Sequence, residues 1–301
     1  MAKKTARFVN PFEIPGRWFK ANLHAHTTTS DGRLSPADRV KQYRKAGYHV
    51  LALTDHNAVN DLKPLPNGRM LLVSGMEFHP KCPGHRNTYH LVALNVDAGL
   101  KFKKLQANTF ISRVNRAGGA VVLAHPHWCG YEYEQFKALK GLAAMEVYNR
   151  TCDVSGRACS ENEWAYALEQ GMHLPATAVD DVHHDLDDAF GGWTMLKMPS
   201  LTPANVVKAV KTGAFYSTCG PHIHDFRAEG DKIVIRCSPA ASIHFISTAP
   251  YGAMLRAEPG KTVSEFSAEF KKDWWGNPLP FVRARVTDPQ GRMAWTNPLY
   301  L

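Results

Sequence analysis

The sequence predicts an α/β protein followed by a smaller β-rich unit. Apolar runs of strand length alternate with segments of helical period over the first 220 residues, which is typical of βαβ repeats. After Gly220-Pro221 the strand-like runs continue without any segment of helical period. We therefore expect one unit over residues 1–220 and a β-rich C-terminal unit over residues 221–301. About eight strands with interleaved helices favour an α/β barrel over an open, doubly wound sheet.

The first predicted βαβ unit begins at Trp18–His26, where side chains alternate as they do in a strand. A helix is expected next, because Ser35 is a good N-cap, Pro36 suits the first helical position and Gly47 suits the end. The apolar run Val50–Thr54 then predicts a buried strand. Two strands joined by a helix should be parallel.

The same alternation continues along the chain. Further strands of the first unit are expected at Met70–Ser74, Tyr89–Val96, Ala120–Ala124, Ala143–Tyr148, His173–Val179 and Ala214–Thr218. Helices are expected at Lys104–Ala117, Tyr133–Leu139, Ser160–Gln170 and Pro203–Thr212. In the second unit, strands are expected at Ile223–Ala228, Lys232–Cys237, Ser242–Thr248, Val263–Phe270 and Phe281–Thr287.

Composition excludes several classes of protein. The formal net charge is +9, but the lysines and arginines are scattered, which is typical of a solvated basic surface rather than a nucleic-acid interface. No apolar run is long enough to span a membrane, and no apolar segment of a secretory signal follows the basic N-terminus. The six cysteines form no C-x-x-C pair. We therefore expect a cytoplasmic protein without disulfides or a membrane partner.

Histidine spacing gives the first chemical indication. His24 and His26 stand two apart in a predicted strand, so both imidazoles should point to the same side. The intervening and flanking side chains Leu23 and Ala25 are apolar and can pack on the other side. Two histidines turned to one side at the end of a strand indicate a metal site, with a pair of surface histidines as the alternative.

Further histidines and acidic residues follow other predicted strands, where α/β folds collect their chemistry. They are Asp31, Asp55, His56, Glu77, His79, His90, His125, His127, Asp180, Asp181, His183 and His184. Recurrence at so many strand ends is hard to ascribe to chance. Many histidines with few carboxylates suit Zn, Mn or Fe better than Mg or Ca.

The pattern H-x-H, S-D-G, T-D-H, G-x-E, H-P and D-x-H resembles the PHP family, named for polymerase and histidinol phosphatase. The resemblance covers about Arg17–Gly220. It implies a distorted seven-stranded (β/α) barrel that holds two or three divalent transition-metal ions, and many members are phosphoesterases. More loosely, the whole chain with its β-rich tail is similar to a branch that includes carbaryl hydrolases, which cleave carbamates or esters.

Carried over by motif, the resemblance implies three sets of metal ligands. The first set is His24, His26, Glu77 and Asp181; the second is Glu77, His90 and His125; the third is Asp31, His56 and His183. Glu77 would thus bridge two ions. His79 and His85 are alternatives to His90, which we favour because it lies within the predicted apolar strand, in Tyr-His-Leu-Val-Ala-Leu. His127 and His184 are candidates for substrate contacts, and Asp55 and Asp180 for orienting a ligand.

These residues predict a metal-dependent hydrolase of phosphomonoesters, with Glu77, Asp181 and His183 as the catalytic residues. A water shared by two close metals would attack the phosphoryl group in line. Arg33, Arg150 and His127 are the expected substrate-binding residues, and the expected partner is a small phosphorylated molecule, a nucleotide included. Two alternatives stay open: the same site could cleave a carbamate, ester or amide, or the chain could be a non-catalytic module that binds a metal or ligand. The sequence does not predict an oligomeric state.

Overall fold

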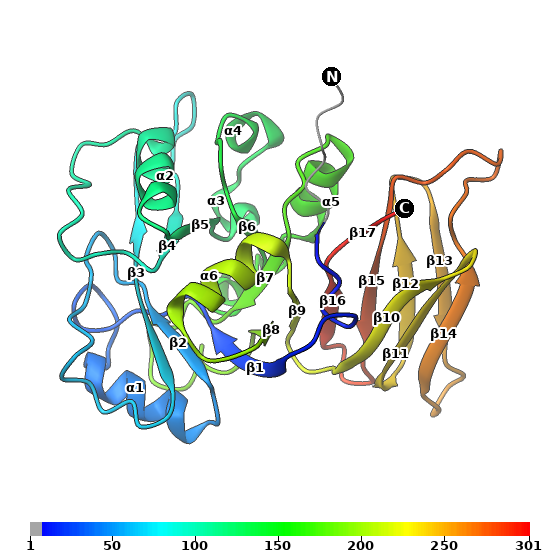
Figure 1. The fold of residues 1–301 in the computed structure, drawn as a ribbon, viewed down its shortest axis with the longest axis horizontal. Coiled ribbons are helices and arrows are strands. Elements are labelled where there is room, and N and C mark those ends of the chain that lie inside the picture. The colour runs from blue at the N-terminus through cyan, green and yellow to red at the C-terminus, as the bar shows by residue number, and fades with distance from the viewer. Residues whose placement is uncertain (1–7) are drawn as a thin grey trace.

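The computed structural model describes residues 8–301 (Figure 1). The first part of the chain alternates strands and helices in the order β1 (Arg17–Asn22), α1 (Pro36–Lys45), β2 (Val50–Leu53), β3 (Leu71–Phe78), β4 (Leu91–Leu94), α2 (Ala107–Arg116), β5 (Ala120–Leu123), α3 (Pro126–Cys129), α4 (Tyr133–Lys137), β6 (Ala144–Asn149), η1 (Thr151–Ser155), α5 (Glu161–Glu169), β7 (Ala176–Val179), β8 (Trp193–Met198), α6 (Pro203–Thr212) and β9 (Phe215–Thr218). Every helix that the sequence predicts is present, and α6 has the expected bounds.

The caps explain why α1 and α6 end where they do. The Ser35 side chain accepts a hydrogen bond from the backbone N–H of Asp38, and Thr202 does the same for Asn205. Pro36 and Pro203 occupy the first turns, where no backbone donor is needed. Gly213 ends α6 in the left-handed conformation that favours glycine.

One long mixed sheet organises the molecule. Its strand order is β13-β12-β15-β16-β9-β8-β1-β2-β3-β4-β5-β6-β7. The pairs β1-β2, β2-β3, β5-β6 and β6-β7 are parallel, as predicted. The pairs β3-β4 and β4-β5 are antiparallel, so the expectation of a parallel strand at β4 was wrong. The loop of residues 79–90 that joins β3 to β4 contains no helix, which allows the chain to turn straight back.

The barrel expected from the sequence is not closed by a continuous ladder of strands. The strand order has two ends, at β13 and at β7. Beyond β1 and β7 a single parallel bridge joins Ala25 to Val182, and the His26 amide donates to the Val182 carbonyl at 3.0 Å. The structure is therefore a mixed α/β fold in which the sheet curves until the extensions of its first and last barrel strands meet. The sequence analysis did not predict β8, which pairs antiparallel with β1.

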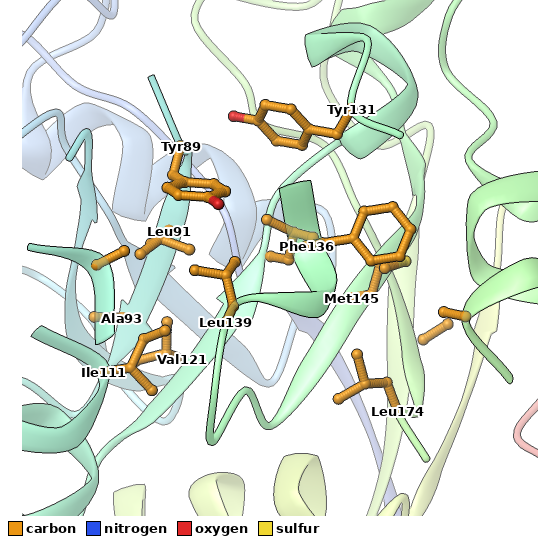
Figure 2. Close-up of a cluster of buried hydrophobic side chains, with 14 of the residues drawn as sticks. Tyr89, Leu91, Ala93, Ile111, Val121, Tyr131, Phe136, Leu139, Met145 and Leu174 are labelled. Atoms are coloured by element: carbon orange, nitrogen blue, oxygen red, sulfur yellow. The ribbon is translucent and has the colours of Figure 1, made fainter. Parts of the chain in front are cut away.

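Strands β4 and β5 are buried on both faces, which explains their continuous apolar sequences. Leu91 and Val121 point toward a cluster formed with helices α2, α4 and α5 (Figure 2). Val92 and Val122, one residue further on, join a second cluster that includes the valines of α6. Alternation along each strand thus divides one apolar run between two cores.

The C-terminal part of the chain is built entirely from strands, as predicted. They are β10 (Ile223–Glu229), β11 (Lys232–Ala240), β12 (Ser242–Ile246), β13 (Gly252–Arg256), β14 (Val263–Glu269), β15 (Phe281–Thr287), β16 (Met293–Thr296) and β17 (Leu299–Tyr300). The sheet β10-β11-β14 packs on the end of the long sheet through residues such as Phe226, Ile235, Phe245 and Val286. Because β16 pairs with β9, the long sheet continues across the expected boundary at Gly220-Pro221, and independent folding of residues 221–301 stays a prediction.

Candidate metal centre

A pocket of about 460 Å³ opens where β1, β2, β3, β5 and β7 end and where β4 begins. Most of the histidines and carboxylates that the sequence predicts as metal ligands line it or lie directly beneath it. The antiparallel direction of β4 does not disturb this gathering, because its first residue Leu91 pairs with Phe78 at the end of β3. His90 therefore lies beside Glu77 although it precedes its strand.

Four buried donor atoms form the first group. Nε2 of His24 and Nε2 of His26 are 3.1 Å apart. Asp181 Oδ1 lies 3.1 Å from the first nitrogen and 2.9 Å from the second, and Glu77 Oε2 lies 3.4 Å from both. Four ligands about 2.0–2.1 Å from one ion in a tetrahedron are about 3.3–3.4 Å apart. The spacing of this group is therefore close to that of a tetrahedral metal site.

The second oxygen of Glu77 faces a different set of histidines. Oε1 lies 2.7 Å from His90 Nδ1 and 3.4 Å from His125 Nε2. His79 Nε2 lies 3.4 Å from the same oxygen, so the structure places His79 as well as His90 at this position. His85 is directed away and contacts the Gly130 carbonyl. Glu77 is thus positioned to bridge two ions.

A third group gathers around Asp31, whose side chain is 55 % exposed. Asp31 Oδ2 lies 3.3 Å from His56 Nε2, and Oδ1 lies 3.5 Å from His183 Nε2. His26 belongs to this group through its other nitrogen, with Nδ1 3.8 Å from Asp31 Oδ1. The three donor groups share His26 and Glu77, so they form one continuous cluster.

Unpartnered polar atoms show that this cluster fits cations. Glu77 Oε2, Asp181 Oδ1, His56 Nδ1 and His79 Nε2 are buried and form no hydrogen bond within residues 8–301. A buried polar atom without a partner costs free energy, and an ionised carboxylate costs most. These atoms converge on the positions where metal ligands are needed. Divalent ions bound at the donor groups described above would satisfy these atoms.

The electrostatics of the cluster agree with this reading. Burial opposes protonation of His24 and His26, but the neighbouring carboxylates outweigh it, so the pKa of His24 is well above its usual value and that of His26 rises to about 9. Burial also opposes ionisation of Glu77 and Asp181, yet the facing histidines hold the pKa of both carboxyls well below the usual range. The carboxylates are therefore ionised, and protons on the histidines would have to leave when a metal binds.

Glu146 supports the first group, and the sequence analysis missed it. Its Oε1 accepts a hydrogen bond from His24 Nδ1 at 2.8 Å, which leaves Nε2 facing the cluster. Its Oε2 accepts from the backbone N–H of His125 and from Asn149 Nδ2, both at 2.9 Å. Asn149 also donates to Asp181 Oδ2 at 3.1 Å. A single glutamate within the apolar strand β6 is the signal that could have identified this residue.

Asp55 and Asp180 contact loops rather than the side chains of the metal ligands, and their role in orienting a ligand stays a prediction. Asp55 accepts hydrogen bonds from the backbone of Thr27 and Ser30, the turn that follows His26. Asp180 accepts from Tyr43 Oη at 2.6 Å and from three successive amides, residues 190–192. Burial raises the pKa of Asp180 to about 6. Both carboxylates fix the backbone from which ligands project.

The buried guanidinium of Arg39 joins two ligand-bearing segments, and the sequence analysis did not identify it. Its Nε donates to the His26 carbonyl, and Nη1 and Nη2 donate to the carbonyls of His184 and His183.

The backbones of His125 and Asp181 have φ values of +25° and +56°, a region that residues other than glycine rarely adopt. Such strain persists only where the surroundings impose it, and it is typical of functional sites.

The three residues predicted to bind substrate do not line this pocket. Arg33 is exposed, and it contacts a ligand-bearing segment through its backbone amide, which donates to the His183 carbonyl. Arg150 pairs with Asp153 and lines a neighbouring hollow of about 360 Å³. His127 pairs with Glu163 at 2.7 Å. Their predicted role stays a prediction, whereas His184 does line the pocket together with Trp128.

The cysteines near the cluster have other partners. Cys129 Sγ lies 3.4 Å from Nδ1 of His125, the ring nitrogen that faces away from Glu77. Cys219 contacts the backbone of Met293. All six cysteines are unpaired, in line with the absence of disulfides expected from their spacing. Within residues 8–301, no helix combines the length and apolar character required to cross a bilayer.

Comparison with known proteins supports the fold. No protein-family model matches the sequence. A curated 5'-3' exoribonuclease of Haemophilus influenzae is 34 % identical over 82 residues, which are 26 % of this chain and 29 % of that protein. The chain thus matches less than a third of the length of this relative.

Solved structures extend the comparison to the whole chain. A two-domain protein of Bacteroides vulgatus, described as containing a predicted PHP-like metal-dependent phosphoesterase, superimposes with a TM-score of 0.55 over 99 % of this chain and 100 % of its own, at 15 % identity. Two further structures are similar over part of the chain. One is a putative metal-dependent phosphoesterase of Bifidobacterium adolescentis, with a TM-score of 0.44 and 17 % identity over 54 % of this chain and 87 % of its own. The other is an amidohydrolase of Chromobacterium violaceum with bound sulfate, with a TM-score of 0.44 and 18 % identity over 56 % of this chain and 89 % of its own. The first match shows that this chain shares its fold, and that the fold occurs in a PHP-like protein.

Proposed function

We propose that this protein is a metal-dependent hydrolase of phosphate esters, with small phosphomonoesters as its substrates and two or three Zn, Mn or Fe ions as its cofactors. One observation carries the proposal: each oxygen of the buried Glu77 carboxylate faces a separate set of histidines. A bridging carboxylate of this kind is suited to a centre with two adjacent cations. The PHP-like neighbour and the exoribonuclease relative support phosphate as the group attacked.

The protein's own side chains have three tasks in this reaction. His24, His26, Glu77 and Asp181 would hold one ion, Glu77 with His90 and His125 a second, and Asp31 with His56 and His183 a third. Bound divalent ions would supply Lewis acidity, which acidifies water and stabilises the negative charge of the phosphoryl group. Glu146 and Asn149 hold His24 and Asp181 in place, and Arg39 fixes the segment that carries His183.

His184, which lines the pocket and belongs to none of the three ligand sets, is the group best placed to move a proton; His183 could do so only where no third ion is bound to its Nε2. Both line the pocket, and Nδ1 of His183 contacts the Asp181 carbonyl at 2.7 Å, which leaves Nε2 facing the cavity and Asp31. Burial lowers the pKa of His183, so its imidazole is neutral near pH 7.

The unpaired state of all six cysteines supports a reducing compartment, and we propose a cytoplasmic location on that ground.

A second function is favoured by the walls of the pocket. Among residues 8–301, no lysine or arginine lines it, so phosphate would find no cation there besides the metals. The indole of Trp128 is 43 % exposed at the rim and packs edge-on against His90 and His125, with ring centroids 5.7 and 5.1 Å away. Val154 is also exposed there. An apolar rim suits a carbamate, ester or amide with an aromatic leaving group.

A substrate panel separates these functions. The protein would be reconstituted with Mn or Zn and assayed on phosphomonoesters, phosphodiesters, naphthyl carbamates and acyl esters, with Asp181→Asn as the inactive control. We expect the highest kcat/KM for phosphomonoesters. Higher kcat/KM for carbamates or acyl esters, with phosphates at the level of the control, would overturn the phosphoesterase proposal and support the second function. Full metal loading without turnover of any substrate would support a binding module instead.

A further inference from the structure

A second cavity lies far along the chain from the metal ligands, on the outer face of the C-terminal strands. It has a volume of about 900 Å³. Its floor is formed by β12, β13 and β15, and the loop of residues 257–262 forms a wall. The residues that line it include none of the candidate metal ligands. This cavity therefore belongs to a different site.

The register of the strands places its floor residues on one face. Ser242 of β12 lies opposite Arg256 of β13 and opposite Thr287 of β15. Two residues further on, His244 lies opposite Arg285. Directly opposed residues of antiparallel strands share a face, and residues two apart do as well. The intervening residues, such as Ile243 and Val286, point to the opposite side and join the apolar core between the two sheets.

The charge of the cavity is unbalanced. Arg256, Arg285 and Lys261 line it, against the single carboxylate of Glu258. Glu258 already forms an ion pair with Lys261 at 2.6 Å, and Arg285 forms one with Glu161 of α5 at 2.9 Å. Arg256 forms no ion pair with any residue of 8–301, and its guanidinium contacts only the sulfur of Met254, at 3.9 Å. The cavity therefore contains one arginine whose charge no carboxylate balances.

The remaining polar groups on the floor suit an oxyanion. The hydroxyls of Ser242 and Thr287 take part in no side-chain hydrogen bond among the described residues, and Ser242 lies between Arg256 and Thr287 across the register. Burial, and then the neighbouring Arg285, lower the pKa of His244, which enters the site as a neutral ring. A guanidinium presents parallel N–H donors that match a phosphate or a carboxylate, and hydroxyls can complete its coordination.

From this arrangement we infer that the cavity on β12, β13 and β15 is a binding site for a small oxyanion-bearing molecule, with Arg256 as its principal anchor. The cavity has room for an organic molecule that carries a phosphate or carboxylate group. The ligand would be separate from the substrate of the metal centre. This inference does not depend on the proposed hydrolase activity.

Calorimetric titration of the full-length, metal-free protein with pyrophosphate and with citrate tests this inference. We expect at least one of the two anions to bind with one equivalent per chain, and to bind equally well to Asp181→Asn, in which the metal centre is altered. Arg256→Ala should weaken binding by about tenfold or more, because a charged donor is lost. Glu258→Gln should strengthen it, since it removes the one carboxylate of the lining. Preference for pyrophosphate or for citrate identifies the class of oxyanion.

Arg236→Ala is the matched control, because Arg236 is an arginine of the same C-terminal part, with a side chain 59 % exposed on the other sheet. The Arg236→Ala protein should bind the anions with the affinity of the wild type. Thermal unfolding of every variant is the control for folding, and Arg256→Ala should remain folded because its side chain is exposed. The inference is overturned if neither anion binds, if Arg256→Ala binds as tightly as Arg236→Ala, or if Asp181→Asn alone abolishes binding.

Discussion

Two buried clusters of charge can be compared in this molecule, and they differ in how their carboxylates are satisfied. In the metal centre, Glu77 and Asp181 each keep a buried oxygen without a hydrogen-bond partner. In the second cluster, Glu161 of α5 pairs with Arg283 at 2.6 Å and with Arg285 at 2.9 Å, and it accepts from the indole N–H of Trp295 at 3.1 Å. Both of its oxygens have partners.

The difference separates function from stability. Full pairing of the Glu161 carboxylate makes this cluster a connection between α5 and the C-terminal strands β15 and β16, with no carboxylate oxygen left over for a metal ion, although Nε of Arg283 and Nε of Arg285 stay without a partner. Incomplete pairing makes the Glu77 cluster depend on something that the chain does not supply. Removal of a carboxylate should therefore have opposite consequences in the two clusters. The predictions below test this contrast.

The largest effect is expected for Glu77→Gln. The substitution keeps the size of the side chain and removes the charge that would bridge two ions, so kcat/KM should fall by about 10³-fold or more. Metal content measured by elemental analysis should fall by at least one equivalent per chain. Wild-type metal content in this variant would show that Glu77 is not a ligand.

The opposite result is expected for Glu161→Ala. It leaves Arg283, whose side chain is 3 % exposed, as a buried charge without a carboxylate. Breaking such a buried pair costs about 3–5 kcal/mol, which denaturant unfolding of the metal-free protein would measure. The metal content of the folded protein should remain that of the wild type. A loss of metal as large as in Glu77→Gln would remove the contrast between the clusters.

A smaller effect is expected for Glu146→Gln, which contacts a ligand without being one. The amide can no longer accept at both oxygens, so His24 Nδ1 and the backbone N–H of His125 compete for one acceptor. Loss of such an outer partner lowers metal affinity by about 10–100-fold. Competition titration with a chromophoric chelator measures this change, and Glu163→Gln, which alters the partner of His127, is the control that should leave the affinity unchanged.

Local patterns predicted most of the fold, and the reasons are visible in single elements. Caps and periodicity located α1 and α6, and the apolar run of β4 was recognised because the strand is buried on both faces. The antiparallel direction of β4 conflicts with the expected barrel and not with the local pattern, because no helix was predicted between β3 and β4 either. β8 was missed since its sequence, Trp-Thr-Met-Leu-Lys-Met, alternates between buried and partly exposed positions and has no continuous apolar run.

For the site, residue type was informative and side-chain direction was not. The histidines and acids of the motifs come together because the strand ends meet, whatever the direction of each strand. Arg33 and Arg150 also follow strand ends, but neither lines the pocket, and no feature of the sequence encodes that. Glu146 and Arg39 act through contacts with residues more than 100 positions away. Such contacts exist only in the folded chain.

The smallest effect expected is on the pH dependence of stability, and it again separates the two clusters. Burial opposes ionisation of Glu161, but Arg283 and Arg285 outweigh it and lower its folded-state pKa below the ordinary value of 4.5. The native state then binds fewer protons than the unfolded state in this range, so the contribution of Glu161 is complete above pH 4.5 and is lost as the pH falls through the folded-state pKa. In Glu161→Gln this acid-dependent loss should be weaker, although the variant is less stable at every pH above it. Urea unfolding of metal-free wild type and variant between pH 7 and pH 3.5 measures the two slopes, and parallel curves would show that Glu161 is not responsible.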